Sequence, residues 1–230
     1  MKFSNPILLV AVLAFTMTRA QEKIKSFDFK EGEVLDIILL SQTENSNELF
    51  ERYKKTAFPV AFEHTYQPQL GFNISELILG TNKPQAFLFG KWSSLEKRKS
   101  FLDVIAERVP DFHQQRRDLF PYFGLTYYEM SKDLKFSVDP SKFNVATALW
   151  NNPSKKDHSF FKKWKEAVKK FGGEVILSLE NGASPIGYYY NADVLCIVQW
   201  QNENAFQTFV EKHPLSFYKS LRNVHQFVIQ

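Results

Sequence analysis

The feature that most constrains the fold is an internal duplication, because one stretch of this chain recurs later in similar form. Residues 87–92 end in Trp92 and are followed by a polar start and Phe101; residues 195–200 end in Trp200 and are followed in the same way by Phe209. The two tryptophans are 108 positions apart, and so are the two phenylalanines. A repeated strand-then-helix unit predicts an architecture in which each copy covers an apolar face of the other.

Hydrophobic periodicity extends the repeat over most of the chain. In the first copy we expect strands at 34–40, 66–79, 86–92 and 125–128, and helices at 47–63, from 95 onward, and around 112–119. In the second copy we expect strands at 142–150, 174–179, 194–200 and 226–229. A helix carries the apolar stripe of Phe161, Trp164, Val168 and Phe171, and a further helix spans 202–222 with an interruption near Pro214. Each copy therefore has the order β-α-β-β-α-β.

That order is the ferredoxin-like motif, and it predicts an α+β fold. The third strand of each copy is apolar without alternation, which is typical of strands that are covered on both faces. A single unit leaves one sheet face open, so we expect the two tandem units to close into one intramolecular α/β barrel. The predicted organisation is a signal peptide at 1–20, a first unit at 21–130, a linker at 131–141 and a second unit at 142–230.

The first twenty residues have the layout of a secretory signal. Lys2 supplies the positive start, residues 6–15 form a short apolar stretch, and Thr18 to Ala20 offer small residues before a cleavage point. The apolar stretch is too short to span a bilayer. We therefore expect a secreted or periplasmic protein without stable membrane insertion after cleavage.

Charge and cysteine content exclude some classes of function. Loss of Lys2 and Arg19 with the signal lowers the formal net charge from +4 to +2, and no clustered basic face suggests nucleic acid as a partner. The single cysteine, Cys196, cannot form an internal disulfide and is interpreted as a small buried hydrophobe. The core must supply the stability, and a monomer is compatible with the closed barrel.

Several residues of the second copy resemble the dimeric α/β barrel superfamily, in particular a branch of uncharacterised function that is related to cofactor-free antibiotic-biosynthesis monooxygenases. The resemblance is carried by Gly172-Gly173, by residues 192–200, by Phe209 and by the stretch from Pro214 to Tyr218. Pro214 precedes Ser216, which departs from the order of the family. The resemblance implies the barrel fold and a pocket between sheet and helices in each unit, and it does not assign an activity.

His64 and Tyr66 are the predicted catalytic pair. They lie at the entry to the second expected strand of the first copy, where His64 and Thr65 stand at the positions of the glycine pair of the second copy at the 108-residue spacing. Two residues that are two positions apart on a strand share a face. A histidine can move protons near neutral pH, and a tyrosine can do so when its pKa is lowered. The alternative is a surface histidine beside a packed tyrosine.

Three aromatic side chains are the predicted ligand-binding residues: Trp92 and Trp150 at strand ends, and Tyr190 in a hairpin or loop segment. They could hold an aromatic ligand or a sugar ring, or they could simply close the core. Arg116 and Arg117 could bind an acidic group, although neighbours on a helix point in different directions, so a joint clamp is not expected.

The leading hypothesis is a small-molecule-binding barrel, with enzymatic activity of the cofactor-free monooxygenase type left open. One alternative is a non-catalytic binding or interaction protein, and another is an exported enzyme that acts on carbohydrate or uronate by elimination. The five histidines are scattered without metal-ligand spacing, and no phosphate-binding loop is present. No metal and no cofactor are therefore predicted.

Overall fold

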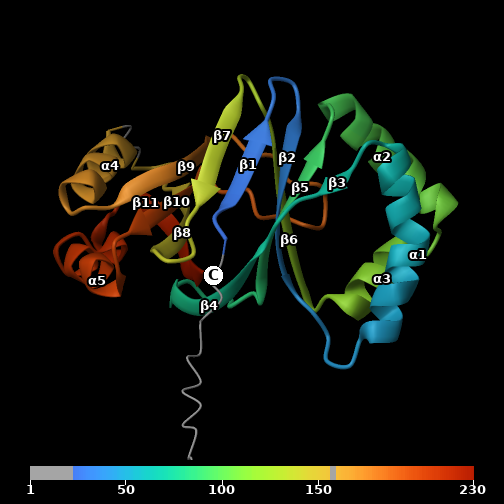
Figure 1. The fold of residues 1–230 in the computed structure, drawn as a ribbon, viewed down its shortest axis with the longest axis horizontal. Coiled ribbons are helices and arrows are strands. Elements are labelled where there is room, and N and C mark those ends of the chain that lie inside the picture. The colour runs from blue at the N-terminus through green and yellow to red at the C-terminus, as the bar shows by residue number, and fades with distance from the viewer. Residues whose placement is uncertain (1–22, 156–158) are drawn as a thin grey trace, which may run out of the picture.

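The computed structural model describes residues 23–155 and 159–230 and shows two layers of helices on either side of a central β structure (Figure 1). The strands are β1 (Lys25–Phe29), β2 (Val34–Ser41), β3 (Gln67–Pro68), β4 (Phe72–Leu79), β5 (Ala86–Trp92), β6 (Tyr122–Glu129), β7 (Leu134–Val138), β8 (Phe143–Asn151), β9 (Glu174–Glu180), β10 (Val194–Trp200) and β11 (Leu221–Ile229). The helices are α1 (Asn47–Glu63), α2 (Leu95–Arg108), α3 (Phe112–Leu119), α4 (Phe160–Lys170), α5 (Glu203–Lys212) and a 3₁₀ turn at Leu215–Phe217.

The sheet order confirms the predicted α+β fold. We call residues 34–129 the first half and residues 143–229 the second half. Strands of the first half lie in the order β6-β2-β5-β4 and those of the second half in the order β11-β8-β10-β9, with antiparallel pairing throughout. In both halves this is the spatial order 4-1-3-2 of the ferredoxin-like motif.

The two halves join edge to edge and nearly close a barrel. At one edge β4 pairs with β11, where Ile74 lies opposite Ile229 and Leu79 opposite Gln226. At the other edge the connection between β9 and β10 reaches back to β6 through bridges of Leu125 to Tyr189 and of Tyr127 to Ala183. The nearly closed barrel is therefore formed within one chain.

The segments before the two halves are also strands, which the sequence analysis did not predict. β1 lies in the expected polar leader and β7 in the expected linker at 131–141, and the two pair with each other antiparallel. Phe27 and Phe136 are opposite each other in this pairing, with stacked rings 4.6 Å apart. Alternate side chains of both strands are buried, so each strand contributes one face to the core.

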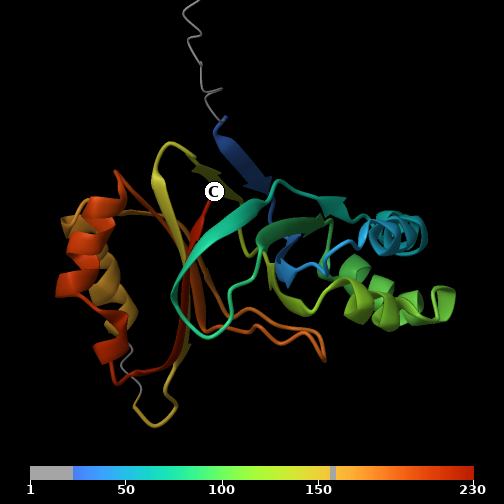
Figure 2. The ribbon, with the colours of Figure 1, turned by 90° about the horizontal axis from the view of Figure 1, so that it is seen from below.

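Successive side chains of each barrel strand point to opposite faces of the sheet, so the barrel interior and the helix-covered faces form separate cores. In β2, Leu35, Ile37 and Leu39 point into the barrel, where they pack with interior residues of both halves. The intervening residues face the helices. α1, α2 and α3 cover the first half and α4 and α5 cover the second, at opposite ends of the molecule in both views (Figures 1 and 2). Each half thus has its own helix–sheet interface.

Three expected elements differ in the structure. The extended run at 66–79 is interrupted, so that β3 and β4 are separate strands, and only the first two residues of β4 pair with β5. The helix expected at 202–222 ends at Lys212, just before Pro214, and β11 begins five residues earlier than expected, at Leu221. Pro59 lies inside α1 without ending it.

Residues 1–20, the expected signal peptide, lie outside the described residues. Within the described part of the chain no helix is long and apolar enough to cross a membrane.

Candidate functional site

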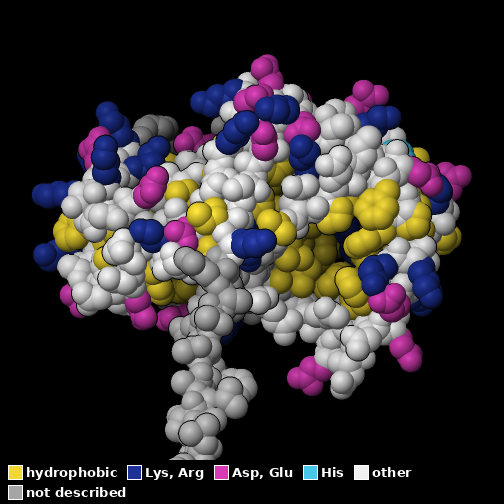
Figure 3. Space-filling model, viewed as in Figure 1, with side chains coloured by type: hydrophobic (Ala, Val, Ile, Leu, Met, Phe, Trp, Pro, Cys, Tyr) yellow, Lys and Arg dark blue, Asp and Glu magenta, His cyan; other side chains and the backbone are white. Residues whose placement is uncertain are grey.

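A cavity of about 190 Å³ lies between the sheet and the helices of the first half. Apolar side chains surround a hollow between the sheet and α1 on the face seen in Figure 3. We call it the first-half cavity. It is lined by Asp36, Ile38, Leu40, Phe50, Tyr53, Ala57, Phe58, Ala61, Tyr66, Pro68, Gln69, Leu88, Phe89, Trp92, Arg98, Phe101, Leu102, Arg116, Phe120, Phe123 and Leu125.

The floor of the cavity is made by the centres of three adjacent strands. Ile38 of β2 is in register with Leu88 of β5 on one side and with Leu125 of β6 on the other. Ile38 and Leu88 keep part of their surface accessible although they lie beneath the helix layer. The accessible surface belongs to the cavity, so the helices of the first half do not pack fully onto the sheet.

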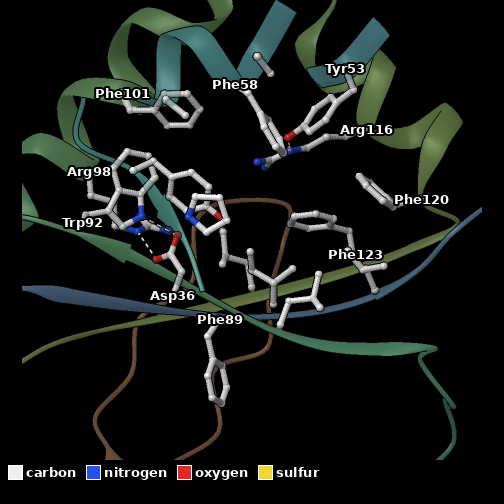
Figure 4. Close-up of a pocket in the computed structure, with 18 of the residues that line it drawn as sticks. Asp36, Tyr53, Phe58, Phe89, Trp92, Arg98, Phe101, Arg116, Phe120 and Phe123 are labelled. Atoms are coloured by element: carbon white, nitrogen blue, oxygen red, sulfur yellow. Dashed lines mark hydrogen bonds and ion pairs between the residues drawn. The ribbon is translucent and has the colours of Figure 1, made fainter. Parts of the chain in front are cut away.

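One end of the cavity holds a buried ion pair (Figure 4). The carboxylate of Asp36 accepts a 2.6 Å bond from Arg98 Nε and a 2.9 Å bond from Trp92 Nε1. The Arg98 guanidinium also stacks 3.8 Å from the centre of the Tyr127 ring. Its Nη1 is buried without a hydrogen-bond partner among the described residues. This nitrogen has almost no accessible surface, so it does not face the open space of the cavity.

The other end holds Arg116, a cation surrounded by aromatic rings (Figure 4). Its guanidinium lies 4.3 Å from the ring centre of Phe112, 4.6 Å from Phe123 and 5.0 Å from Tyr188. Its Nε donates to the Tyr53 hydroxyl at 2.9 Å. Burial lowers the pKa of Arg116 and the phenols of Tyr53 and Tyr188 raise it, with a net increase, so the side chain stays charged.

The second half has no such ion pair at the matching positions. Val34 lies opposite Trp92 and Phe143 lies opposite Trp200, so Val34 and Phe143 are equivalent positions. Two residues further along each strand, Val145 occupies the place that Asp36 has in the first half. Ser94 and Asn202 are the N-cap residues of α2 and α5. Four residues after the N-cap, Phe206 therefore occupies the place that Arg98 has in the first half. Val145 and Phe206 are both buried in one apolar cluster. A charged pair and an apolar pair thus occupy equivalent places.

The floor of the second half is also closed. Thr147 of β8 is in register with Cys196 and Gln226, and all three are buried. The Gln226 amide donates to the Thr147 hydroxyl at 3.0 Å. Cys196 is fully buried, and burial raises the pKa of its thiol to about 12. This confirms the interpretation of Cys196 as an unreactive core residue.

The predicted pair His64 and Tyr66 is not carried by a strand. His64 ends α1, Thr65 has a φ of 72°, and β3 begins only at Gln67. Tyr66 lines the first-half cavity and packs against Trp92, with ring centres 4.9 Å apart. His64 is not among the lining residues; its ring lies 6.4 Å from that of Phe101. The premise that both share one strand face was wrong, and a catalytic role for either remains a prediction.

The three predicted ligand-binding aromatics are divided between two cavities. Trp92 lines the first-half cavity. Trp150 and Tyr190 contact each other edge to face at 5.4 Å and line a second, more polar cavity of about 230 Å³ near the seam between the halves. There the Tyr190 hydroxyl donates to His225 Nδ1 at 2.7 Å, and His225 Nε2 donates to the Asn82 carbonyl at 2.8 Å. Both histidine nitrogens are therefore satisfied.

Sequence reasoning missed the polar ends of the first-half cavity. Asp36 was available as a signal, because it is the only charged residue in an otherwise apolar strand. Its partner Arg98 is 62 positions away on a helix, and nothing local links the two. Of the adjacent arginines, Arg116 faces the cavity, whereas Arg117 is exposed and bonds to Gln114, as expected for neighbours on a helix.

Within residues 23–155 and 159–230, no group of three or more His, Cys, Asp or Glu side chains is placed to hold a metal ion. The candidate site is therefore described by its apolar walls, one ion pair and one further cation.

Comparisons with known proteins give similarity in structure only. No protein-family model and no curated protein sequence matches this chain. Among solved structures, an anthrone oxidase-like protein is 13% identical, with a TM-score of 0.48 over 88% of this chain and 94% of that chain. Chlorite dismutase from Candidatus Nitrospira defluvii in complex with imidazole is 6% identical, with a TM-score of 0.44 over 88% and 92%.

A third solved structure, a proposed monooxygenase from Fusobacterium nucleatum subsp. nucleatum, is 10% identical to this chain. Its TM-score is 0.39, over 88% of this chain and 93% of that chain. At such identities and scores the comparisons carry no argument about activity. The fold assignment rests on the strand order, and the functional argument rests on the cavity.

Proposed function

We propose that this protein binds a small, largely apolar molecule in the first-half cavity. The observation that carries the proposal is the contrast between the halves. The second half buries Val145, Phe206 and Phe209 in one apolar cluster between its sheet and helices, whereas the first half leaves a cavity of about 190 Å³ at the corresponding level. An unfilled cavity costs roughly 24 cal/mol per Å³, so an open interface lowers stability unless a ligand uses it.

The size and lining of the cavity define the ligand class. The volume is slightly larger than that of an engineered cavity of about 150 Å³ that accepts benzene. The walls are mostly aliphatic and aromatic, with Phe58, Phe101 and Phe123 among them. A single substituted aromatic ring fits this space, and such rings pack well against other rings. The hydroxyl groups of a sugar would find few partners there, which disfavours the carbohydrate alternative.

The resemblance to antibiotic-biosynthesis monooxygenases adds a catalytic form of the same proposal, in which a bound aromatic molecule is oxidised by oxygen. Tyr66 is the residue of the predicted pair that lines the cavity. Burial and the nearby Asp36 charge raise its pKa, the opposite of the lowering that a base would need. Tyr66 is therefore a neutral phenol near neutral pH, which donates a hydrogen bond to a ligand and does not remove a proton from it. Oxygen uptake in the presence of a bound aromatic probe tests this form.

We also propose, from the layout of residues 1–20, that the protein is exported and loses this segment. Mass determination of the N-terminus of protein recovered from its native compartment checks this, with cleavage after Ala20 as the expected result.

The binding proposal is tested with neutral aromatic probes. Toluene, indole and p-cresol are titrated into the protein, and thermal stability and calorimetric heats are measured. We expect at least one probe to raise the melting temperature. Ile38→Phe places a larger side chain on the cavity floor and should abolish that shift. Ile24→Phe makes the same substitution at an exposed site outside the cavity and should preserve it.

Two results would contradict the proposal. One is the absence of binding by all three probes. The other is equal binding by the wild type and the Ile38→Phe variant, which would place the probes elsewhere.

A further inference from the structure

We propose that the natural ligand of the first-half cavity is a small aromatic monocarboxylate, with its anionic group on Arg116. This inference rests on the proposed function and specifies its ligand class. It is carried by the Arg116 guanidinium, a cation that lines one end of a mostly apolar space and has no ion-pair partner among the described residues.

Arg116 is the first observation. Of the ion pairs formed by described residues, none includes Arg116. Its described neighbours are aromatic rings and the hydroxyls of Tyr53 and Tyr188, and none of them is a carboxylate that would balance the charge. A cation in a mostly apolar space gains most from an anion, because Coulomb attraction is strong where water is scarce.

The charge of the cavity limits the ligand to one negative charge. Its charged lining residues are Asp36, Arg98 and Arg116. Asp36 and Arg98 neutralise each other through their 2.6 Å contact, which leaves a net charge of +1 at Arg116. A planar carboxylate matches the planar guanidinium and can accept two parallel bonds from it. A doubly charged phosphate would leave one negative charge without a partner in the cavity.

The Arg98 end of the cavity is the second observation, because it does not compete for the anion. The Arg98 side chain is 2% exposed, and Asp36 balances its charge. Its Nη1 has no hydrogen-bond partner among the described residues but has almost no accessible surface, so a ligand in the cavity does not reach it. The expected ligand therefore places its one charged group on Arg116 and an aromatic ring against the apolar walls.

The inference is tested by comparing matched probes within each protein variant. Benzoate, 4-hydroxybenzoate and 4-hydroxybenzamide are titrated by calorimetry at pH 7 and low salt. For the wild type we expect 4-hydroxybenzoate to bind at least about tenfold more tightly than 4-hydroxybenzamide, the typical gain of one charge-assisted contact.

Arg116→Met should remove the preference for the carboxylate over the amide while amide binding persists. Arg116→Lys keeps the charge and should retain part of the preference. Arg117→Met removes a neighbouring exposed charge and should leave the preference unchanged. The ratio of two affinities in one variant is independent of how much that variant is destabilised, so a weakened fold does not obscure the result.

The outcomes separate this inference from the proposed function. If neutral aromatic probes bind and the wild type shows no carboxylate preference, the inference is wrong and the binding proposal stands. If the preference persists in Arg116→Met, Arg116 is not the anion site and the inference is again wrong. If no aromatic probe binds, charged or neutral, the proposed function itself fails.

Discussion

The two helix–sheet interfaces of this molecule are built on the same strand order, yet they differ at their centres. In the second half, Trp164, Trp200 and Phe209 fill this central space, and the pocket of that half lies at the start of α4, where Phe160 and Arg222 are among its lining residues. In the first half, the equivalent central space is bordered by an ion pair and a lone arginine and contains a cavity. The comparison shows that the fold does not require a cavity at this place, so the first-half cavity reflects the residues of the first half.

The two halves also differ in the size of one side chain just after the helices α1 and α4. Thr65 and Gly172 both follow a helix with a left-handed φ, 72° and 83°, so Tyr66 corresponds to Gly173. A side chain at Gly173 would collide with Trp200, which packs directly on this backbone. In the first half, Tyr66 itself lies over Gly90, where a side chain would collide with it. The first half thus has Tyr66 where the second half has Gly173, and it has Gly90 where the second half has Val198.

The sharpest test of the comparison is to give the first half the apolar pair of the second. Asp36→Val alone leaves the Arg98 charge buried without a partner and should cost about 3–5 kcal/mol of unfolding free energy. The double variant Asp36→Val with Arg98→Phe copies Val145 and Phe206 and should recover most of this loss. Urea unfolding of the wild type, both single variants and the double variant measures the coupling. If the losses of the two single variants simply add in the double variant, the apolar pair does not replace the ion pair in the first half.

A second test compares equivalent phenylalanines. Phe209→Ala should cost about 3–5 kcal/mol, because the ring is enclosed by Trp200, Phe171 and His213. Phe101→Ala should cost about 1–2 kcal/mol less, because one side of this ring already borders the cavity. Urea unfolding at constant pH measures both. An equal or larger loss for Phe101→Ala would mean that the first half is packed as tightly as the second.

The smallest expected effect concerns the seam between the halves, where His225 of β11 bonds to Asn82 of the first half. Burial lowers the pKa of His225 below its unfolded value of about 6.5, and the bond to Asn82 opposes this only in part. The unfolded chain therefore binds a proton first as the pH falls, so stability should be constant above about pH 7 and decrease below about pH 6.5.

The measurement is the urea midpoint of the wild type and of His225→Gln between pH 7.5 and 5. The difference between the two proteins should shrink as the pH falls, because the variant lacks the titrating group. A difference that stays constant across this range would show that His225 does not titrate differently in the folded state.

Local patterns were sufficient to predict most elements and the strand order within each half. The stripe of Trp164 and Val168 predicted α4, and the repeat of Trp92 and Trp200 predicted equivalent strands. The pairing of β1 with β7 was missed because each strand is short and lies in a polar segment, and only their mutual contact buries Phe27 and Phe136.

The candidate site could be predicted only in part, because its polar groups come from distant segments. Trp92 and Tyr66 were identified as residues near a ligand, and both line the first-half cavity. Asp36, Arg98 and Arg116 become a site only when β2, α2 and α3 surround one space. The fixed 108-residue spacing also aligned the glycine pair with His64 and Thr65. When the ends of α1 and α4 are aligned instead, the glycine pair corresponds to Thr65 and Tyr66.

The seam between β4 and β11 sets a condition on how the chain can fold as it is synthesised. β4 pairs with β5 only through Phe72 and Asn73, while the positions from Ile74 to Leu79 pair with β11 at residues 226–229. Most of β4 therefore remains an open strand edge until β11 has been made, and open edges are sites of association between chains. The first half can form its helices and inner strands early, but its exposed edge is protected only when β11 pairs with it.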